Sequence, residues 1–303
     1  MPRDLISRYI WIVDTLTRYE RLTRRQLNKL WRRSSLSDGA DLPERTFFHY
    51  RRAIEENFHI DIACDSQGRY YIDRDGSRQG KALTNWMLDS YAVNNAIKGS
   101  ETPMDRVEIE DVPSAREFLP VVLDAIKENH KLSFTYAGFN RSRAEHGIRF
   151  LPYFLKRYKQ RWYMAGVREK SGDIRTYALD RVKEMTVIDE KFVKDPEVTL
   201  EDLFGNVLGV TSSKADVRTV RLEATATQAK YFRALPLHHS QEEEVHDRYS
   251  IFTYRLKLNY ELVHEVMALG EAVKVLDPPE LKAMVVTELE NALKRYRPTE
   301  DMP

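Results

Sequence analysis

The spacing of the hydrophobic residues changes along the chain, and this change limits the folds that the sequence can adopt. Near the N-terminus these residues recur every three or four positions, as on one face of a helix: Leu5, Tyr9, Ile12, Val13 and Leu16. From Leu132 the interval becomes two, which is typical of strands with one buried face. A chain of 303 residues allows about two or three domains. The sequence therefore predicts an α+β protein of several domains.

Residues 1–75 have the element order of a winged helix-turn-helix, which is a DNA-binding domain. Thr23 and Gln26 form a capping-box pattern at the start of a short second helix, and Pro43 suits the first turn of a third helix. The polar stretch 34–41 separates these two helices. The predicted elements are helices over 5–19, after Thr23 and over 43–58, then strands over 60–64 and 69–72.

Four further segments follow this domain. They are a helical linker at 76–130, a small Sm-like or SH3-like β-barrel at 131–190, a connector at 191–213 and a ferredoxin-like αβ domain at 214–303. Within the linker we expect helices over 83–97 and 115–129, and within the connector a short helix near 200–207. The barrel strands are predicted at 132–136, 149–155, 161–167, 175–179 and 184–189. The αβ domain is predicted to have strands near 217–224, 242–248, 250–258 and 271–276, and helices near 226–234, 262–269 and 279–296.

The third predicted helix separates its residues into two faces. One face is an apolar stripe: Phe47, Tyr50, Ile54 and Phe58. Arg45, His49 and Arg52 fall on the opposite face, which a helix docked by its apolar stripe would present to a major groove. The residues predicted to bind DNA are Arg24, Arg25, Arg45, Thr46, His49, Arg52 and Arg69. The alternative is a solvated basic face on a purely structural three-helix unit.

The positive charge of the chain is concentrated in one segment. The whole chain has a net charge of +1, but residues 131–183 contain 13 Lys and Arg against 4 Asp and Glu. A local basic patch, rather than the total charge, attracts a polyanion. The acidic balance of the αβ domain complements this patch, so we expect that domain to pair with the basic barrel of a second subunit and to support a homodimer.

Several short motifs in the basic segment occur together. Arg161-Trp162-Tyr163-Met164 is preceded by Phe134-Thr135-Tyr136 and Arg149-Phe150-Leu151-Pro152, and is followed by Arg175-Thr176-Tyr177-Ala178-Leu179-Asp180-Arg181. This set resembles the WYL domain, which is named after a Trp-Tyr-Leu sequence. Met164 stands here in place of the leucine. The family pattern Thr-x-x-Arg-Asp in the third helix is also replaced, by Thr46-Phe47-Phe48-His49-Tyr50.

The resemblance implies a bacterial, usually homodimeric, transcriptional regulator with a winged helix, a WYL barrel and a C-terminal WCX extension. It implies a repressor, in some relatives one that controls phage-defence genes, whose barrel senses a nucleotide or a single-stranded nucleic acid. The ligand residues carried over are Tyr136, Arg149, Tyr163, Arg175, Tyr177 and Arg181. Guanidinium groups bind phosphates and aromatic rings stack on bases, which is consistent with this set. The alternative is that Arg175 and Arg181 form structural ion pairs, with Asp180 as a partner.

The sequence gives little support to other kinds of site. The histidines His238, His239 and His246 lie near acidic residues but lack a metalloprotease motif, and Cys64 is the only cysteine. We therefore expect no metal, no cofactor and no catalytic residues. No apolar run is long enough to cross a membrane and no signal peptide is evident, so the expected location is the cytoplasm. The other functions considered are a single-strand DNA or RNA-binding module and a nucleic-acid-processing enzyme.

Overall fold

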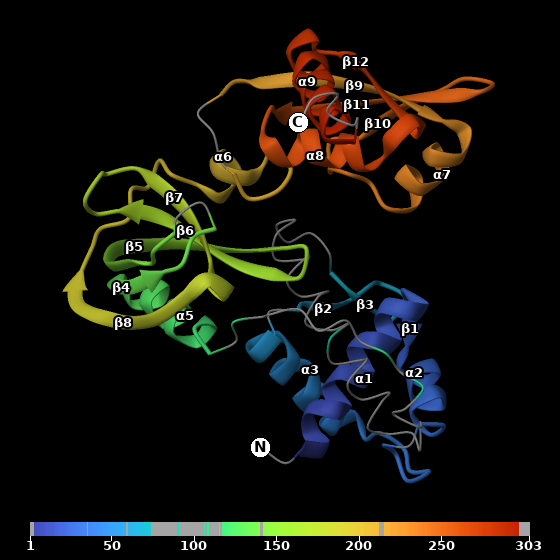
Figure 1. Cartoon of the computed structure of the whole chain (residues 1–303). Helices are drawn as coiled ribbons and strands as arrows, with labels where there is room; N and C mark the ends of the chain where they lie inside the picture. The colour runs from blue at the N-terminus through green and yellow to red at the C-terminus, as the bar shows by residue number, and fades with distance from the viewer. Residues whose placement is uncertain are drawn as a thin grey trace, which may run out of the picture. The chain divides into compact units, whose positions relative to one another are not determined.

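The computed structural model describes residues 3–34, 36–58, 60–73, 90, 106, 108, 115, 117–139, 142–211 and 215–296 (Figure 1). The chain divides into two units, residues 1–110 and 111–303. In the described part of the chain the strands form antiparallel sheets of three, four and five strands, and helices accompany each of them. The chain is therefore an α+β protein, as the sequence predicted. The helix expected over 83–97 lies outside the described residues, apart from Ser90.

Helices and a small sheet form the described elements at the start of the first unit. They are α1 (Arg3–Tyr19), β1 (Leu22–Thr23), α2 (Arg24–Trp31), α3 (Glu44–Phe58), β2 (Ile62–Cys64) and β3 (Arg69–Ile72), with the sheet order β1-β3-β2. Thr23 caps α2 through the predicted box with Gln26. The strand β1 is not predicted from the sequence, because two residues are too few to show an alternating pattern. The strand β2 begins later than the predicted residue 60, since pairing with β3 starts only at Ile62.

The core of the first unit is built from the predicted helix stripes. Phe47, Tyr50 and Ile54 of α3 are buried together with Leu16 of α1 and Leu27 of α2. The ring of Phe47 packs edge-on against Tyr70 of β3, which joins the third helix to the hairpin. The orientation of α3 is therefore fixed by its apolar side, and its opposite side is left to solvent.

The turn between β2 and β3 is held by one carboxylate. Asp65 accepts hydrogen bonds from the backbone N–H groups of Gln67 and Arg69 and pairs with the guanidinium groups of Arg21 and Arg69. These contacts lower the pKa of Asp65 from its ordinary 3.8 to about 2. A carboxylate with a lowered folded-state pKa stabilises the fold above its unfolded-state pKa and loses this effect as the pH falls through the folded-state value.

We expect Asp65→Asn to destabilise the first unit at neutral pH, because the amide cannot replace both ion pairs. The difference in stability between this variant and the wild type should shrink as the pH falls from about 4 towards 2. Chemical denaturation at a series of pH values measures it. A difference that stays constant over this range would show that the charge of Asp65 contributes nothing. Asp14→Asn is the control, because Asp14 forms an exposed pair with Arg18 on α1.

The second unit begins with a helix and a five-stranded sheet. These elements are α5 (Leu119–Glu128), β4 (His130–Tyr136), β5 (Glu145–Tyr158), β6 (Arg161–Arg168), β7 (Ile174–Ala178), the short 3-10 turn η2 (Leu179–Arg181) and β8 (Val182–Lys191). The sheet order is β7-β6-β5-β4-β8. Val122 and Ala125 of α5 pack with Phe134, Phe150 and Met164 to form its core.

Some boundaries in this sheet differ from the predicted ones. The helix begins at Leu119 rather than at 115, because Pro120 favours a helix start, and it ends where Asn129 adopts a left-handed conformation. The strand expected over 149–155 extends from Glu145 to Tyr158. The strand expected to include Leu179 ends at Ala178, where the chain turns into η2.

A four-stranded sheet follows a short connecting helix. The elements are α6 (Leu200–Phe204), β9 (Val217–Thr225), α7 (Ala226–Ala234), β10 (Glu242–Val245), β11 (Tyr249–Lys257), α8 (Tyr260–Ala268), η3 (Gly270–Ala272), β12 (Val273–Asp277) and α9 (Pro279–Tyr296). The sheet order is β10-β11-β9-β12. α6 is shorter than the helix expected near 200–207, since it ends at Phe204 with Gly205 as its C-cap. α8 begins two residues earlier than expected, because the side chain of Asn259 caps it.

Candidate functional site

The exposed side of α3 is one of two candidate regions. Arg45, His49 and Arg52 are exposed there, on the side of the helix opposite the buried ring of Phe47, as the sequence predicted for its two faces. Arg52 pairs with Glu56 one turn further along, at 2.8 Å, and both side chains are solvent-exposed. Exposed pairs of this kind are weak and exchange readily for another anion. The guanidinium of Arg52 is therefore open to competition from another anion.

The other residues expected to bind DNA differ in their accessibility. Arg24 donates a hydrogen bond to the backbone carbonyl of Leu42, and its guanidinium lies 4.6 Å from the centre of the Phe47 ring. Burial lowers the pKa of Arg24, although nearby acidic groups oppose this shift. Arg24 thus supports the segment that leads into α3. Arg25 is exposed, Thr46 is half-buried, and Arg69 is held by Asp65.

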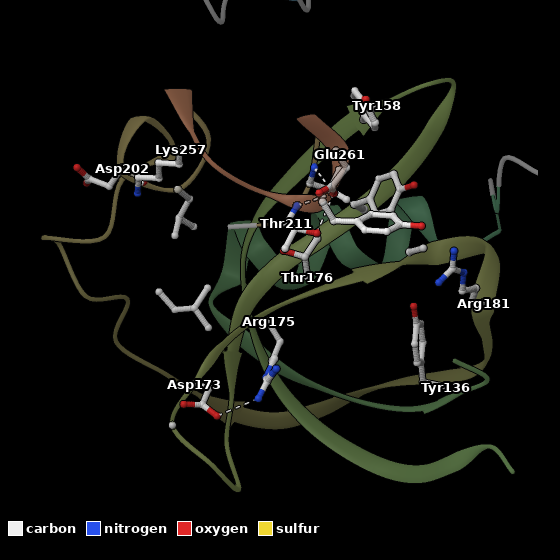
Figure 2. A pocket seen from close by; sticks show the side chains of 17 residues that line it. Tyr136, Tyr158, Asp173, Arg175, Thr176, Arg181, Asp202, Thr211, Lys257 and Glu261 are labelled. Carbon is white, nitrogen blue, oxygen red and sulfur yellow. Dashed lines mark hydrogen bonds and ion pairs between the residues drawn. The ribbon is translucent and has the colours of Figure 1, made fainter. Parts of the chain in front are cut away.

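The second candidate region is a pair of cavities within the second unit, found among its described residues. The larger has a volume of about 1050 Å³ and the smaller about 390 Å³. Both are lined by Tyr136, Arg175, Thr176 and Arg181. The larger is also lined by Tyr163, Lys257 and Glu261. Figure 2 shows Lys257 and Glu261 among the side chains around this cavity, together with Arg175 and Arg181. The two shared arginines and several tyrosines offer cations and aromatic surfaces to a ligand, and the larger cavity is also lined by the acidic residues Asp173, Asp202 and Glu261.

The structure brings together five of the six residues carried over as a ligand site. Tyr136, Tyr163, Arg175 and Arg181 line the larger cavity, and Tyr177 lines the smaller one. Tyr177 is only 8% exposed, and its ring also packs against Phe134 and Phe150 of the core. Burial raises the pKa of both Tyr163 and Tyr177, so their hydroxyl groups stay protonated at neutral pH. They can therefore donate hydrogen bonds to an anion.

The sixth residue, Arg149, lies in a separate ion-pair network. Its guanidinium pairs with Glu169 and Glu190, which also pair with Lys131 at 2.7 and 2.8 Å. These contacts lower the pKa of both carboxyl groups and raise those of Arg149 and Lys131. Arg149 lines neither cavity. The structure therefore gives this residue a role in joining strands of the sheet.

The two shared arginines have different surroundings. Arg175 pairs with Asp173 at 3.2 Å, and both side chains are more than half exposed. Arg181 makes no ion pair with any described carboxylate, and Asp180 pairs instead with Arg161. The guanidinium of Arg181 lies 3.8 Å from the centre of the Phe139 ring, and its buried Nε has no hydrogen-bond partner among the described residues. Arg181 thus keeps hydrogen-bonding capacity that no described carboxylate uses.

The sequence analysis did not single out several residues that line these cavities. Phe139 follows β4, directly after Gly138, and no motif in the sequence marks it as a cavity residue. Thr211, Lys257 and Tyr260 line the larger cavity from segments well beyond the five-stranded sheet in sequence, since the last strand of that sheet ends at Lys191. No motif links those segments to the sheet, so only the folded chain places them in one wall.

The remaining candidates for chemistry have structural contacts. His238 interacts with the backbone carbonyl of Gly205 and the hydroxyl of Ser240, and His246 stacks on Tyr249. Among the described residues, no group of three or more His, Cys, Asp or Glu could hold a metal ion. Likewise, no described helix is both long enough and apolar enough to cross a membrane.

Comparison with known proteins adds to this geometry. Residues 117–187 match the model of the WYL domain, and residues 216–293 match that of the WCX domain. Among solved structures, the chain is similar to proteasome accessory factor B/C (PafBC) of Arthrobacter aurescens, with 20% identity over 98% of this chain and 48% of that chain, and a TM-score of 0.37. It is also similar to a CRISPR Cas-related protein, with 15% identity over 60% of this chain and 51% of that chain, and a TM-score of 0.37. The chain thus spans about half the length of both. No curated protein matches it.

Proposed function

Because this chain is a member of the WYL-domain family, with a WCX domain after its WYL domain, we propose that it is a ligand-responsive transcriptional regulator. In this proposal residues 1–75 act as a winged helix-turn-helix that binds operator DNA. Residues 131–190 act as an Sm-like barrel that senses an effector, and residues 214–303 act as a ferredoxin-like domain that joins two subunits into a homodimer.

The observation that carries the proposal is the separation of faces on α3. Its buried side fixes the helix against the hairpin, while Arg45, His49 and Arg52 remain exposed in a row. Arginine can donate two hydrogen bonds to a guanine edge, and histidine can donate to or accept from a base. Arg25 is exposed at the start of α2, where backbone N–H groups also attract phosphate.

The paired cavities support the sensing part of the proposal. Arg175 and Arg181 provide cations for phosphate, and the surrounding tyrosines provide surfaces for a base. The effector is a nucleotide or a single-stranded nucleic acid. It changes operator affinity only if it binds two arrangements of the dimer with different affinity. The regulator acts as a repressor that the effector releases from its operator.

The test is a fluorescence-anisotropy titration of the protein on duplex DNA from upstream of its own gene and on scrambled duplex. We expect a preference of about 10³-fold or more for the upstream duplex, with a steep dependence on salt. Arg45→Ala together with Arg52→Ala should remove most of this preference, because both residues face the groove. Arg18→Ala is a matched control, since Arg18 is an exposed arginine of α1 paired within its own helix.

The main alternative is a single-strand DNA or RNA-binding module in which the cavities do the principal binding. It is favoured by the arginines and tyrosines that line both cavities, because single strands bind to cations and stack on aromatic rings. In that case the variant lacking Arg45 and Arg52 would keep its full affinity for nucleic acid. Metal-dependent cleavage of the labelled DNA, lost on His239→Ala, would instead indicate a nucleic-acid-processing enzyme.

A further inference from the structure

Phe139 is a large apolar side chain that the fold leaves in water. It follows β4 and its side chain is 75% exposed, although the rings of Phe134 and Phe150 nearby in the sheet are buried. The ring contributes to the wall of the smaller cavity. An exposed aromatic ring in a cavity wall does not stabilise the core, but it can contact a ligand in that cavity.

One face of the Phe139 ring is already covered by a cation. The Arg181 guanidinium lies 3.8 Å from the ring centre, which is the geometry of a cation–π contact. The guanidinium therefore lies over one face of the ring. Because the ring remains mostly exposed, its other surface is available to a second flat group. A nucleobase is such a group, and it stacks on aromatic rings and on arginine alike.

The two cavities meet at the arginines. Arg175 and Arg181 line both of them together with Tyr136 and Thr176, whereas Phe139 and Arg168 line only the smaller and Tyr163 only the larger. Each cavity therefore has its own aromatic surface, and the cations lie where the two join. This order, aromatic surface then cations then aromatic surface, repeats the order of base, phosphate and base in two successive nucleotides.

From this arrangement, and resting on the proposed function, we infer that Phe139 is the stacking platform of a second base subsite. The effector spans at least two nucleotides, with the phosphate that links them at Arg175 and Arg181. One base lies in the larger cavity beside Tyr163, and the next stacks on Phe139 in the smaller cavity. A mononucleotide fills only one of the two subsites and binds more weakly.

The test is calorimetric titration of the full chain with thymidine monophosphate, dithymidylate and trithymidylate. In the wild type, dithymidylate should bind about tenfold or more tightly than the mononucleotide. The further increase in affinity from dithymidylate to trithymidylate should be smaller. Phe139→Ala should remove most of this gain and leave mononucleotide affinity within about twofold. Phe139→Tyr should retain it, because the stacking surface is preserved. Tyr231→Ala is the control, since Tyr231 is an exposed aromatic residue of α7 that lines neither cavity.

Each other outcome has a distinct meaning. If Phe139→Ala lowers the affinity for all three ligands equally, or changes none of them, the second subsite is wrong while effector binding stands. Equal affinity of the wild type for the mononucleotide and the dinucleotide would also overturn it. If the wild type binds none of the three, the sensing part of the proposed function fails, and the second subsite fails with it.

Discussion

Replacing both Arg175 and Arg181 with alanine is expected to abolish the response to the effector while leaving operator affinity intact without it. Hydrogen bonds to charged groups contribute about 1.5–3 kcal/mol each, so the loss of both cations should weaken effector binding by about 100-fold or more. The operator contacts are assigned to the other unit of the chain, so the duplex affinity should change by less than about twofold. Anisotropy titrations with labelled single strands and with labelled operator measure the two affinities separately.

Arg149→Ala provides the matched control for this double variant. It removes an arginine from the same sheet, but one whose guanidinium is held by Glu169 and Glu190 and lines neither cavity. We expect its effector affinity to match that of the wild type. If Arg149→Ala weakened effector binding as strongly as the double variant, the ligand site would lie elsewhere on the sheet. Equal loss of operator affinity in the double variant would contradict the separation of the two sites.

Phe47→Ala is expected to destabilise the first unit by about 3–5 kcal/mol, the usual cost of removing a fully buried aromatic ring. The Phe47 side chain is 0% exposed, packs on Tyr70 and lies beneath the guanidinium of Arg24. Its loss leaves a cavity between α3 and the hairpin and removes the surface that fixes the exposed face of α3. Operator binding should fall in parallel with the folded fraction of this unit.

The neighbouring ring gives the control for this substitution. Phe48 is 41% exposed, so Phe48→Ala should cost much less stability. Differential scanning calorimetry should show a lowered transition for the first unit in Phe47→Ala and an unchanged transition for the second, because each unit has its own core. A uniform shift of both transitions would mean that the two units unfold cooperatively.

The sequence alone predicted the positions of most helices and strands. The apolar stripe of α3 and the alternation of β4 are set by neighbouring residues, because a helix or strand repeats its buried positions at a fixed interval. Pro43 and the box formed by Thr23 and Gln26 similarly specify where helices begin. The boundaries were less exact, since a cap such as Asn259 or a short pairing such as β1 depends on contacts that spacing does not record.

The residues of the candidate site were harder to predict from the sequence than the helices and strands, because they depend on the tertiary structure. Tyr136, Arg175 and Arg181 were identified in sequence because they belong to recognisable motifs, and the fold gathers them around shared cavities. Arg149 belongs to the same motifs, yet Glu169 and Glu190 hold it in another part of the sheet. Phe139 and Lys257 carry no motif and become cavity residues through folding alone. Local periodicity determines which face of an element is buried, whereas the neighbours of an exposed side chain are set by distant segments that only the folded chain brings together.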